Sequence, residues 1–348
     1  MQKIKLTVLF LARALGMFAL FRYLTRSQLR ILCYHGGSIG DEHTYNSKLF
    51  CPPATLSARL RWLRKHRFNF MSLDDAVKSL ANPRARPQLP TVVTFDDGWH
   101  STGSQLVPLL AAQNIPSTLY LCTQHVAHEG PVPSVSVRYL LSKSALDEVS
   151  LGGFGCDVDG DYQLSDQSQR ETLARAVAAW ISKNTDGRQE VCAVLERFAA
   201  CLQVPSATLD LASRRFDYLS PAELRVAAGQ HCAIELHGHV HCYPFADFTG
   251  LQADIDTCRN WITAAGLPRA RHYCYPSGDF DAQAAADLSR LDVISATTCV
   301  PGLIGTADPA QAYYLPRFLD GGSITALEFE SEMSGFSDFV RGIAARSG

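Results

Sequence analysis

The chain has almost no net charge. Its 348 residues carry 32 Lys and Arg against 34 Asp and Glu, which gives a formal net charge of -2 at pH 7. Proteins that bind nucleic acid usually concentrate Lys and Arg into a basic surface, and this overall balance offers no such field. We therefore expect no nucleic-acid partner. Because 47% of the residues are hydrophobic and 19% are charged, we expect a fold with a large buried core.

No Cys-x-x-Cys pair occurs among the eleven cysteines, and their number is odd. Several of them (Cys33, Cys122, Cys232 and Cys274) lie inside apolar runs, where a thiol behaves as a small hydrophobic group. The pattern predicts reduced core thiols and excludes an obvious disulfide framework or zinc motif. Reduced thiols favour a cytoplasmic location.

The N-terminus lacks an uninterrupted apolar run. Residues 6–24 are mostly apolar, but Arg13 breaks the run, and no small-x-small cleavage site follows it. Basic residues continue from Lys3 to Arg26. We expect residues 1–26 to form an amphipathic helix on a membrane surface, which places the protein peripherally on the inner face of the cell membrane. The alternative is a helix packed on the protein's own core.

Predicted strands and helices alternate along most of the chain. Apolar, β-branched runs predict strands at residues 29–35, 68–71, 91–97, 117–122, 232–236, 272–275, 293–297 and 313–317. Amphipathic or capped stretches predict helices at residues 54–66, 72–80, 105–113, 251–265 and 282–290, and another that starts at Ser220. This alternation is typical of a parallel sheet or barrel.

The alternation stops between residues 125 and 231. Helical stretches dominate there, at residues 168–181 and 190–202, and a glycine-rich segment occupies residues 152–160. We expect a mainly helical insertion that covers one rim of the catalytic domain. Residues 324–348 are expected to form a closing C-terminal helix.

Two adjacent carboxylates, Asp96 and Asp97, end the strand at residues 91–97 and are followed by Gly98. Neighbouring acids repel each other, so a division of labour would explain them: one carboxylate holds a cation and the other handles a proton. The alternative is ordinary turn or capping chemistry.

Three histidines follow the strand at residues 232–236. His237 and His241 are four residues apart, a spacing at which two imidazoles can face one cation, and His239 lies between them. Two His and one Asp leave positions open for water and substrate, with Asp97 as the ligand and Asp96 as the general base. The alternative is a polar surface cluster. His35, at the end of the first strand, is a structural histidine in the simplest interpretation.

Residues 29–322 resemble the polysaccharide deacetylase superfamily, of the carbohydrate esterase family 4 type. The resemblance rests on Tyr34-His35, on residues 94–98 (Thr-Phe-Asp-Asp-Gly), on His237 and His241, on residues 275–278 (Tyr-Pro-Ser-Gly) and on residues 315–317 (Leu-Pro-Arg). It implies an α/β fold, a deformed (β/α) barrel over residues 27–323 with the helical insertion 125–231. It also implies hydrolytic removal of an acyl group, usually N-acetyl from a glycan.

The resemblance also implies roles for individual residues. Asp96 corresponds to the general base, and Asp97, His237 and His241 correspond to the ligands of a divalent metal, with zinc expected. The peptide N–H of Ser277 corresponds to the donor that stabilises the oxyanion. Arg317 is predicted to orient Asp96.

Three departures from the family pattern stand out. Gly238 replaces the usual Ser or Thr, Cys274 replaces an arginine, and no histidine acid occurs near the C-terminus, which leaves His35 or His239 to protonate the leaving amine.

We therefore expect a metal-dependent deacetylase of an N-acetylated saccharide, which is a polysaccharide, an oligosaccharide or a lipid-linked sugar. The alternatives are a hydrolase of a non-glycan C–N bond on the same scaffold and a catalytically weak glycan-binding protein.

Overall fold

A computed structural model describes residues 2–82, 84, 86–127, 130–155, 157–305 and 309–347. Its centre is an eight-stranded sheet in which every pair of neighbouring strands is parallel. The strand order is β11-β10-β9-β6-β5-β1-β12, and β4 also pairs with β5. The strands are β1 (Arg30–Tyr34), β4 (Asn69–Phe70), β5 (Pro90–Asp97), β6 (Ser117–Leu121), β9 (Cys232–Leu236), β10 (His272–Cys274), β11 (Ser295–Thr297) and β12 (Phe318–Leu319).

The sheet curls until its two edges meet. The N–H of Leu315 donates to the carbonyl of Ala296 at 2.9 Å, and the N–H of Thr298 donates to the carbonyl of Leu315 at 2.9 Å. The segment just before β12 therefore pairs with β11, and the deformed (β/α) barrel predicted from the sequence is confirmed.

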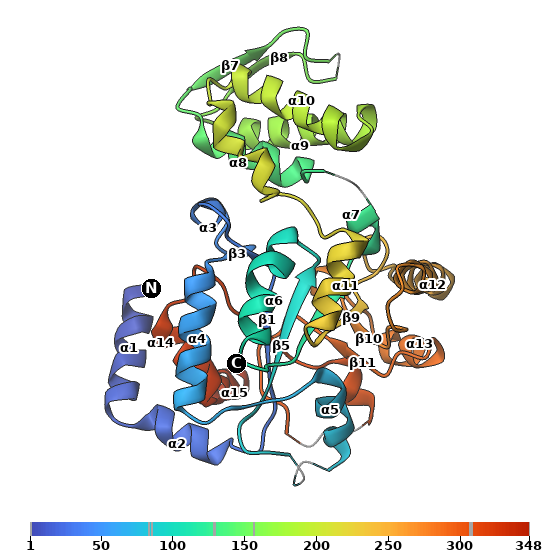
Figure 1. Ribbon diagram of the computed structural model, residues 1–348. Helices are drawn as coiled ribbons and strands as arrows, with labels where there is room; N and C mark the ends of the chain where they lie inside the picture. The colour runs from blue at the N-terminus through green and yellow to red at the C-terminus, as the bar shows by residue number, and fades with distance from the viewer. Residues whose placement is uncertain are drawn as a thin grey trace.

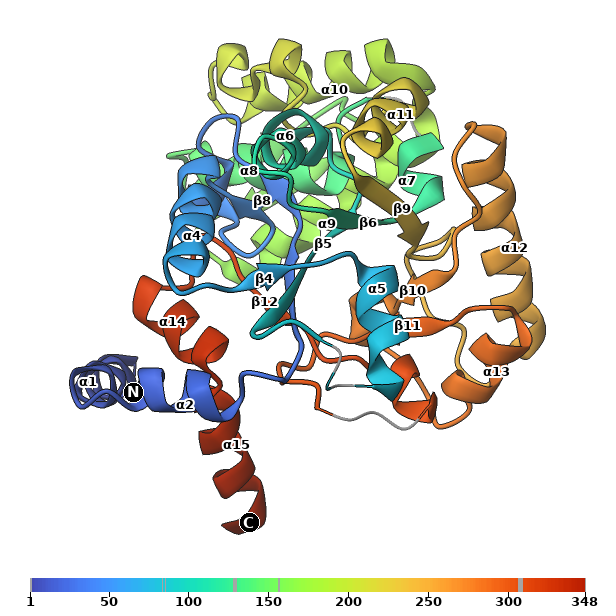
Figure 2. The ribbon, with the colours of Figure 1, turned by 60° about the horizontal axis from the view of Figure 1, so that its bottom comes forward.

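Helices surround the barrel (Figures 1 and 2). They are α4 (Pro53–Lys65), α5 (Leu73–Lys78), α6 (Val107–Ala111), α7 (Thr123–Ala127), α11 (Pro221–Gly229), α12 (Phe248–Ala264) and α13 (Ala284–Arg290). The predicted start of α11 has a physical cause, because Ser220 and Glu223 form a reciprocal capping box. The main core lies between these helices and the sheet.

The predicted insertion is a lobe of its own, drawn above the barrel in Figure 1. Its helices α8 (Pro133–Lys143), α9 (Gln167–Asn184) and α10 (Gly187–Cys201) enclose a separate hydrophobic cluster. The glycine-rich segment joins the two strands of an antiparallel hairpin, β7 (Glu148–Leu151) and β8 (Gly160–Gln163), which the helical expectation missed. A small element of β2 (Gly36–Gly37), α3 (Glu42–Tyr45) and β3 (Phe50–Cys51) lies beside the lobe.

Several predicted boundaries differ from the structure. The last strand starts at Phe318 rather than near residue 313, because residues 309–313 form a 3-10 helix and Pro316 follows. The predicted helix at 105–113 opens with a π-helical turn at Thr102–Leu106.

Both ends of the chain form two helices where one was expected. The N-terminal segment consists of α1 (Gln2–Ala14) and α2 (Met17–Leu24), and the C-terminal segment consists of α14 (Ala326–Ser334) and α15 (Phe336–Ser347). Gly16 (φ 77°) and Gly335 (φ 86°) adopt the left-handed conformation that ends a helix. No single helix in the described chain has the length and apolar composition of a membrane span. The helices α1 and α2 have that length and composition only when taken together, and their axes are bent by 75° at the break between them.

Candidate metal and catalytic site

The site lies where the carboxyl ends of neighbouring parallel strands meet. Asp96 and Asp97 are the last residues of β5, His237 follows β9 directly, and Cys274 ends β10. Asp97 (φ 74°) and Gly98 (φ 101°) both adopt left-handed conformations, so the chain turns sharply behind the second carboxylate. A side chain at Gly98 would place its Cβ 2.6 Å from Leu121 Cδ1, so the glycine is sterically required.

Asp97, His237 and His241 converge on one point. Asp97 Oδ1 lies 3.5 Å from His237 Nε2 and 3.6 Å from His241 Nε2. The two Nε2 atoms are 3.1 Å apart. One cation could therefore contact all three atoms, as in the sequence hypothesis.

The hydrogen bonds around this cluster suit a metal ligand set. His237 Nδ1 lies 2.9 Å from the carbonyl oxygen of Cys274, which can only accept, so Nδ1 carries a proton. Burial lowers the pKa of His237, but Cys274 and the hydrogen bond to Asp97 outweigh it and raise that pKa, so a cation that binds Nε2 would displace the proton there. Trp99 Nε1 donates to Asp97 Oδ2 at 3.1 Å, which leaves Oδ1 for the cation. Two imidazoles and a carboxylate with these outer partners fit a zinc-like divalent ion.

The charges of the cluster depend on one another. Burial raises the pKa of the Asp97 carboxyl, but the hydrogen bond to His237 and the nearby imidazoles of His35 and His241 outweigh it and hold that pKa well below its usual range. Burial and the neighbouring His237 lower the pKa of His241. Both groups are therefore in the states that coordinate metal, an ionised carboxylate and a neutral imidazole.

Asp96 is held on the other side by Arg317. Arg317 Nη1 and Nη2 donate to Asp96 Oδ1 and Oδ2 at 2.7 and 2.8 Å, and both side chains are buried. Burial raises the pKa of the Asp96 carboxyl, but the guanidinium outweighs this effect and lowers it to about 2. Asp96 is thus ionised at neutral pH, and Oδ1, which accepts only from Arg317 Nη1 among the described residues, keeps a second lone pair that can accept a proton.

Cys274, at the position of the expected arginine, lies beside this ion pair. Its Sγ is 3.0 Å from Arg317 Nη2 and 3.7 Å from Asp96 Oδ2. Cys33 Sγ, from β1, also lies 3.4 Å from Asp96 Oδ2. A thiol is smaller than a guanidinium, so Cys274 leaves room for Arg317 to reach the carboxylate from a different part of the chain.

Gly238 has a steric explanation as well. It adopts φ 79°, and a Cβ there would lie 2.8 Å from Asp254 Oδ2. Asp254, on α12, accepts the N–H groups of His239 and Val240 at 2.9 Å each. Asp254 therefore fixes the loop between the two histidines.

The structure places the other predicted residues at the same edge of the barrel but in different settings. His35 is half-buried after β1, and its imidazole lies near enough to contribute to the lowered pKa values of Asp96 and Asp97. Ser277 (φ 57°) lies in the tight turn Pro276–Gly278 directly after β10. His239 is not part of the metal cluster, and its Nδ1 lies 3.0 Å from Thr123 Oγ1.

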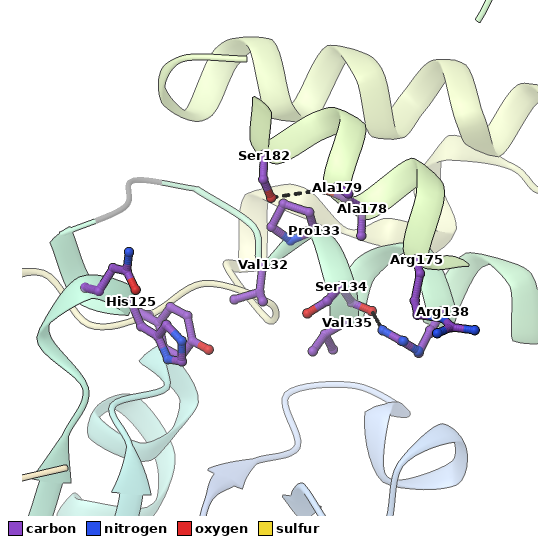
Figure 3. A pocket seen from close by; sticks show the side chains of 12 residues that line it. His125, Val132, Pro133, Ser134, Val135, Arg138, Arg175, Ala178, Ala179 and Ser182 are labelled. Atoms are coloured by element: carbon purple, nitrogen blue, oxygen red, sulfur yellow. Dashed lines mark hydrogen bonds between the residues drawn. The ribbon is translucent and has the colours of Figure 1, made fainter. Parts of the chain in front are cut away.

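A cavity of about 610 Å³ adjoins the cluster, between the lobe and the barrel. The ring of His125 stacks on His241 with centroids 5.7 Å apart and on Tyr218 with centroids 4.9 Å apart, and both His125 and Tyr218 line the cavity. Figure 3 shows His125 at one end of the cavity and Arg138 and Arg175 at the other.

Four residues of this site were not predicted from the sequence. Trp99 follows the carboxylate pair by two residues and could have been suspected from that proximity. Asp254, His125 and Tyr218 carry no local signal, because their roles arise from packing between distant segments.

Comparison with solved structures finds the same fold. The deacetylase PplD of Streptococcus pyogenes, in complex with acetate, has 14% identity and a TM-score of 0.56, with 89% of this chain and 99% of that chain covered. IcaB from Ammonifex degensii has 14% identity and a TM-score of 0.55, with coverage of 89% and 97%. A de-N-acetylase from Aggregatibacter actinomycetemcomitans has 11% identity and a TM-score of 0.53, with coverage of 88% and 99%.

Comparison with curated proteins finds no significant match. The model of the polysaccharide deacetylase family matches residues 84–294, which is more than half of the chain and includes both carboxylates and both histidines. The chain therefore belongs to the polysaccharide deacetylase family, hydrolases that act on carbon–nitrogen bonds other than peptide bonds.

Proposed function

We propose that the protein is a metal-dependent deacetylase that removes N-acetyl groups from a glycan. The observation that carries this proposal is the convergence of Asp97, His237 and His241 beside a second, separately held carboxylate, Asp96. A divalent ion held by these three residues, with zinc expected, would lower the pKa of water and polarise the acetyl carbonyl.

The protein's own groups supply the remaining chemistry. Asp96 accepts a proton from the attacking water, while Arg317 keeps this carboxylate ionised and fixed in orientation. The N–H of Ser277 donates to the developing oxyanion, a contact worth about 3 kcal/mol of barrier in comparable sites. His35 returns a proton to the leaving amine, since His239 hydrogen-bonds Thr123 instead.

The cavity between lobe and barrel accommodates the part of the substrate beyond the reacting sugar. Its wall combines the rings of His125 and Tyr218 with the polar groups of Gln124, Ser134 and Arg175. Sugars bind through this kind of mixture, because one face of the ring is apolar and its hydroxyls need hydrogen-bond partners.

Acetate release from N-acetylglucosamine oligomers tests the proposal. Purified protein should release acetate, a chelator should abolish the activity, and added zinc should restore it. Elemental analysis should find the metal in the wild type and not in His237→Ala. Asp96→Asn should be inactive yet retain metal, whereas Asp256→Asn, which changes an exposed acid on α12, should behave as wild type. Glycan binding without turnover by metal-loaded protein would contradict the assignment.

A further inference from the structure

Exposed apolar side chains are concentrated on three helices, α1, α2 and α15. Eleven of the sixteen large hydrophobic side chains that are exposed in the described chain lie on or between them. These are Ile4, Val8, Phe10, Leu11, Leu15, Leu20, Tyr23, Leu24, Phe339, Val340 and Ile343. Clustered exposure of this kind marks an interaction surface, whereas single exposed hydrophobic residues are ordinary.

The exposed residues form stripes with helical spacing. On α1, Ile4, Val8 and Leu11 recur at intervals of three or four residues, and Leu15 continues the stripe with 79% of its surface exposed. Residues at these intervals share one helix face. On α2 the spacing gives Leu20, Tyr23 and Leu24, and on α15 it gives Phe339, Val340 and Ile343.

The three helices lie at one corner of the molecule, although more than 300 residues of chain separate α2 from α15. The rings of Phe21 and Phe339 have centroids 4.7 Å apart, and those of Phe18 and Phe336 are 5.6 Å apart. Figure 2 shows α1, α2 and α15 together, with α15 extending away from the barrel. The C-terminal helix therefore enlarges the apolar face of the N-terminal pair.

The charge of this corner selects among possible occupants. Residues 1–26 contain five basic residues and no Asp or Glu. Lys5 and Arg13 pair with acids of α14, which leaves Lys3, Arg22 and Arg26 beside the apolar stripes. The guanidinium of Arg26 lies 4.2 Å from the ring centroid of Tyr23, a pairing suited to a headgroup region. Basic residues beside apolar stripes complement anionic lipids, whereas a second copy would bring together charges of the same sign.

Ion pairs and packing favour docking on the bilayer over crossing it. Lys5 pairs with Glu328 at 2.7 Å and Arg13 pairs with Glu330 at 3.0 Å, and both acids belong to α14. Leu9, Phe18 and Phe21 are buried against Phe336 in a common cluster. Insertion of α1 and α2 across a bilayer would break both ion pairs and expose this cluster.

We propose that α1, α2 and α15 together form a docking face for an anionic lipid surface, on which the protein lies without crossing it. The sequence alone indicated residues 1–26 for this role, and the structure adds α15. The proposal does not depend on the catalytic assignment.

Vesicle sedimentation with the purified full chain tests the proposal. Binding should be strong to phosphatidylcholine mixed with phosphatidylglycerol, weaker to phosphatidylcholine alone, and reduced by salt. Leu11→Glu and Val340→Glu should each weaken binding roughly tenfold, because each introduces a negative charge into the exposed apolar face that would contact the lipid. The matched control is Val226→Glu, at an exposed valine on α11, which should bind as the wild type does.

The readouts separate docking from the alternatives. Melting temperature and acetate release from a soluble substrate should match wild type in all three variants, which shows that the fold is retained. Equal binding by Val340→Glu and wild type would overturn the role of α15. Absence of vesicle binding, with a dimer that Val340→Glu dissociates, would assign the face to self-association. Retention in membranes after an alkaline carbonate wash would overturn docking without crossing.

Discussion

At the scale of single residues, the site is defined by how each carboxylate is neutralised. Asp97 faces two imidazoles, whereas Asp96 faces a buried guanidinium and two thiols. Adjacent residues of one strand point to opposite sides, so the repulsion between the two acids is offset by two separate sets of partners. This arrangement fits the proposed division of roles, in which Asp97 holds the cation and Asp96 accepts the proton.

Arg317 is expected to control the orientation of Asp96. Arg317→Lys keeps the positive charge but loses the two-point contact, so kcat/KM should fall about 10- to 100-fold, as for other residues that orient functional groups. Arg317→Met leaves Asp96 buried and unpaired and should cost roughly 3–5 kcal/mol of unfolding free energy. Acetate release and urea unfolding measure the two effects.

Arg259 provides a matched control, because it is buried but donates to the carbonyls of Ala270 and Leu291, outside the site. Arg259→Lys should lower stability and leave kcat unchanged. Equal loss of kcat in both lysine variants would argue against a specific role of Arg317.

Replacement of Gly238 by Ser, a residue that is usual at this position in the family, is expected to destabilise the protein. Gly238→Ser places a Cβ against Asp254 in a left-handed turn, which should cost about 1–3 kcal/mol of unfolding free energy and weaken zinc binding. Zinc titration and urea unfolding check this outcome. Gly229→Ala, at a position with open space around it, should be neutral or slightly stabilising. Tighter zinc binding by Gly238→Ser would contradict the steric account.

His272 should make the free energy of unfolding depend on pH in the acidic range. Burial lowers its pKa to about 4 from 6.5, so the folded state holds the imidazole neutral while the unfolded state takes up a proton below pH 6.5. Its contribution is therefore fully present above that pH and is lost as the pH falls towards 4, by up to about 3 kcal/mol.

His272→Asn should reduce this loss, because an amide takes up no proton in this pH range. Asn can also keep the hydrogen bond that His272 Nδ1 makes with Ser295 Oγ. Urea unfolding at about pH 7 and about pH 4 gives the comparison. The exposed His231 is the control, and His231→Asn should retain the wild-type dependence.

At the scale of elements, the sequence predicted those features that depend on local pattern. The run at residues 91–97 and the spacing of His237 and His241 located β5 and the histidine loop, and parallel pairing then placed them at one edge. The hairpin β7–β8 was missed because each of its strands has only four residues, although Val149 and Leu151 alternate with polar residues in β7. Arg317 was predicted to meet Asp96 only through the family resemblance, since no pattern links residues more than two hundred positions apart.

The lobe is expected to select the substrate. Ala179→Trp on α9 narrows the cavity, so KM for long oligomers should rise about tenfold while kcat for a short acetylated substrate stays near wild type, because the metal cluster is untouched. Lys183→Trp, at an exposed position outside the cavity lining, is the control. An equal loss of kcat/KM for long and short substrates would show that the cavity does not bind the glycan chain.

At the scale of the whole molecule, the catalytic edge and the proposed lipid-binding corner face different directions. The helix α2 precedes β1 by a few residues, so it lies near the amino ends of the strands, whereas Asp96 and Asp97 end β5 at the carboxyl side. Figure 1 shows the lobe above the barrel and α2 at the lower end of the barrel, whereas α1 runs along its side next to α4.

A protein resting on that corner would keep Asp96 and Asp97 at the strand ends opposite α2. Its reaction centre would then open away from the part of the lipid surface that α2 contacts, towards chains that extend outward from it.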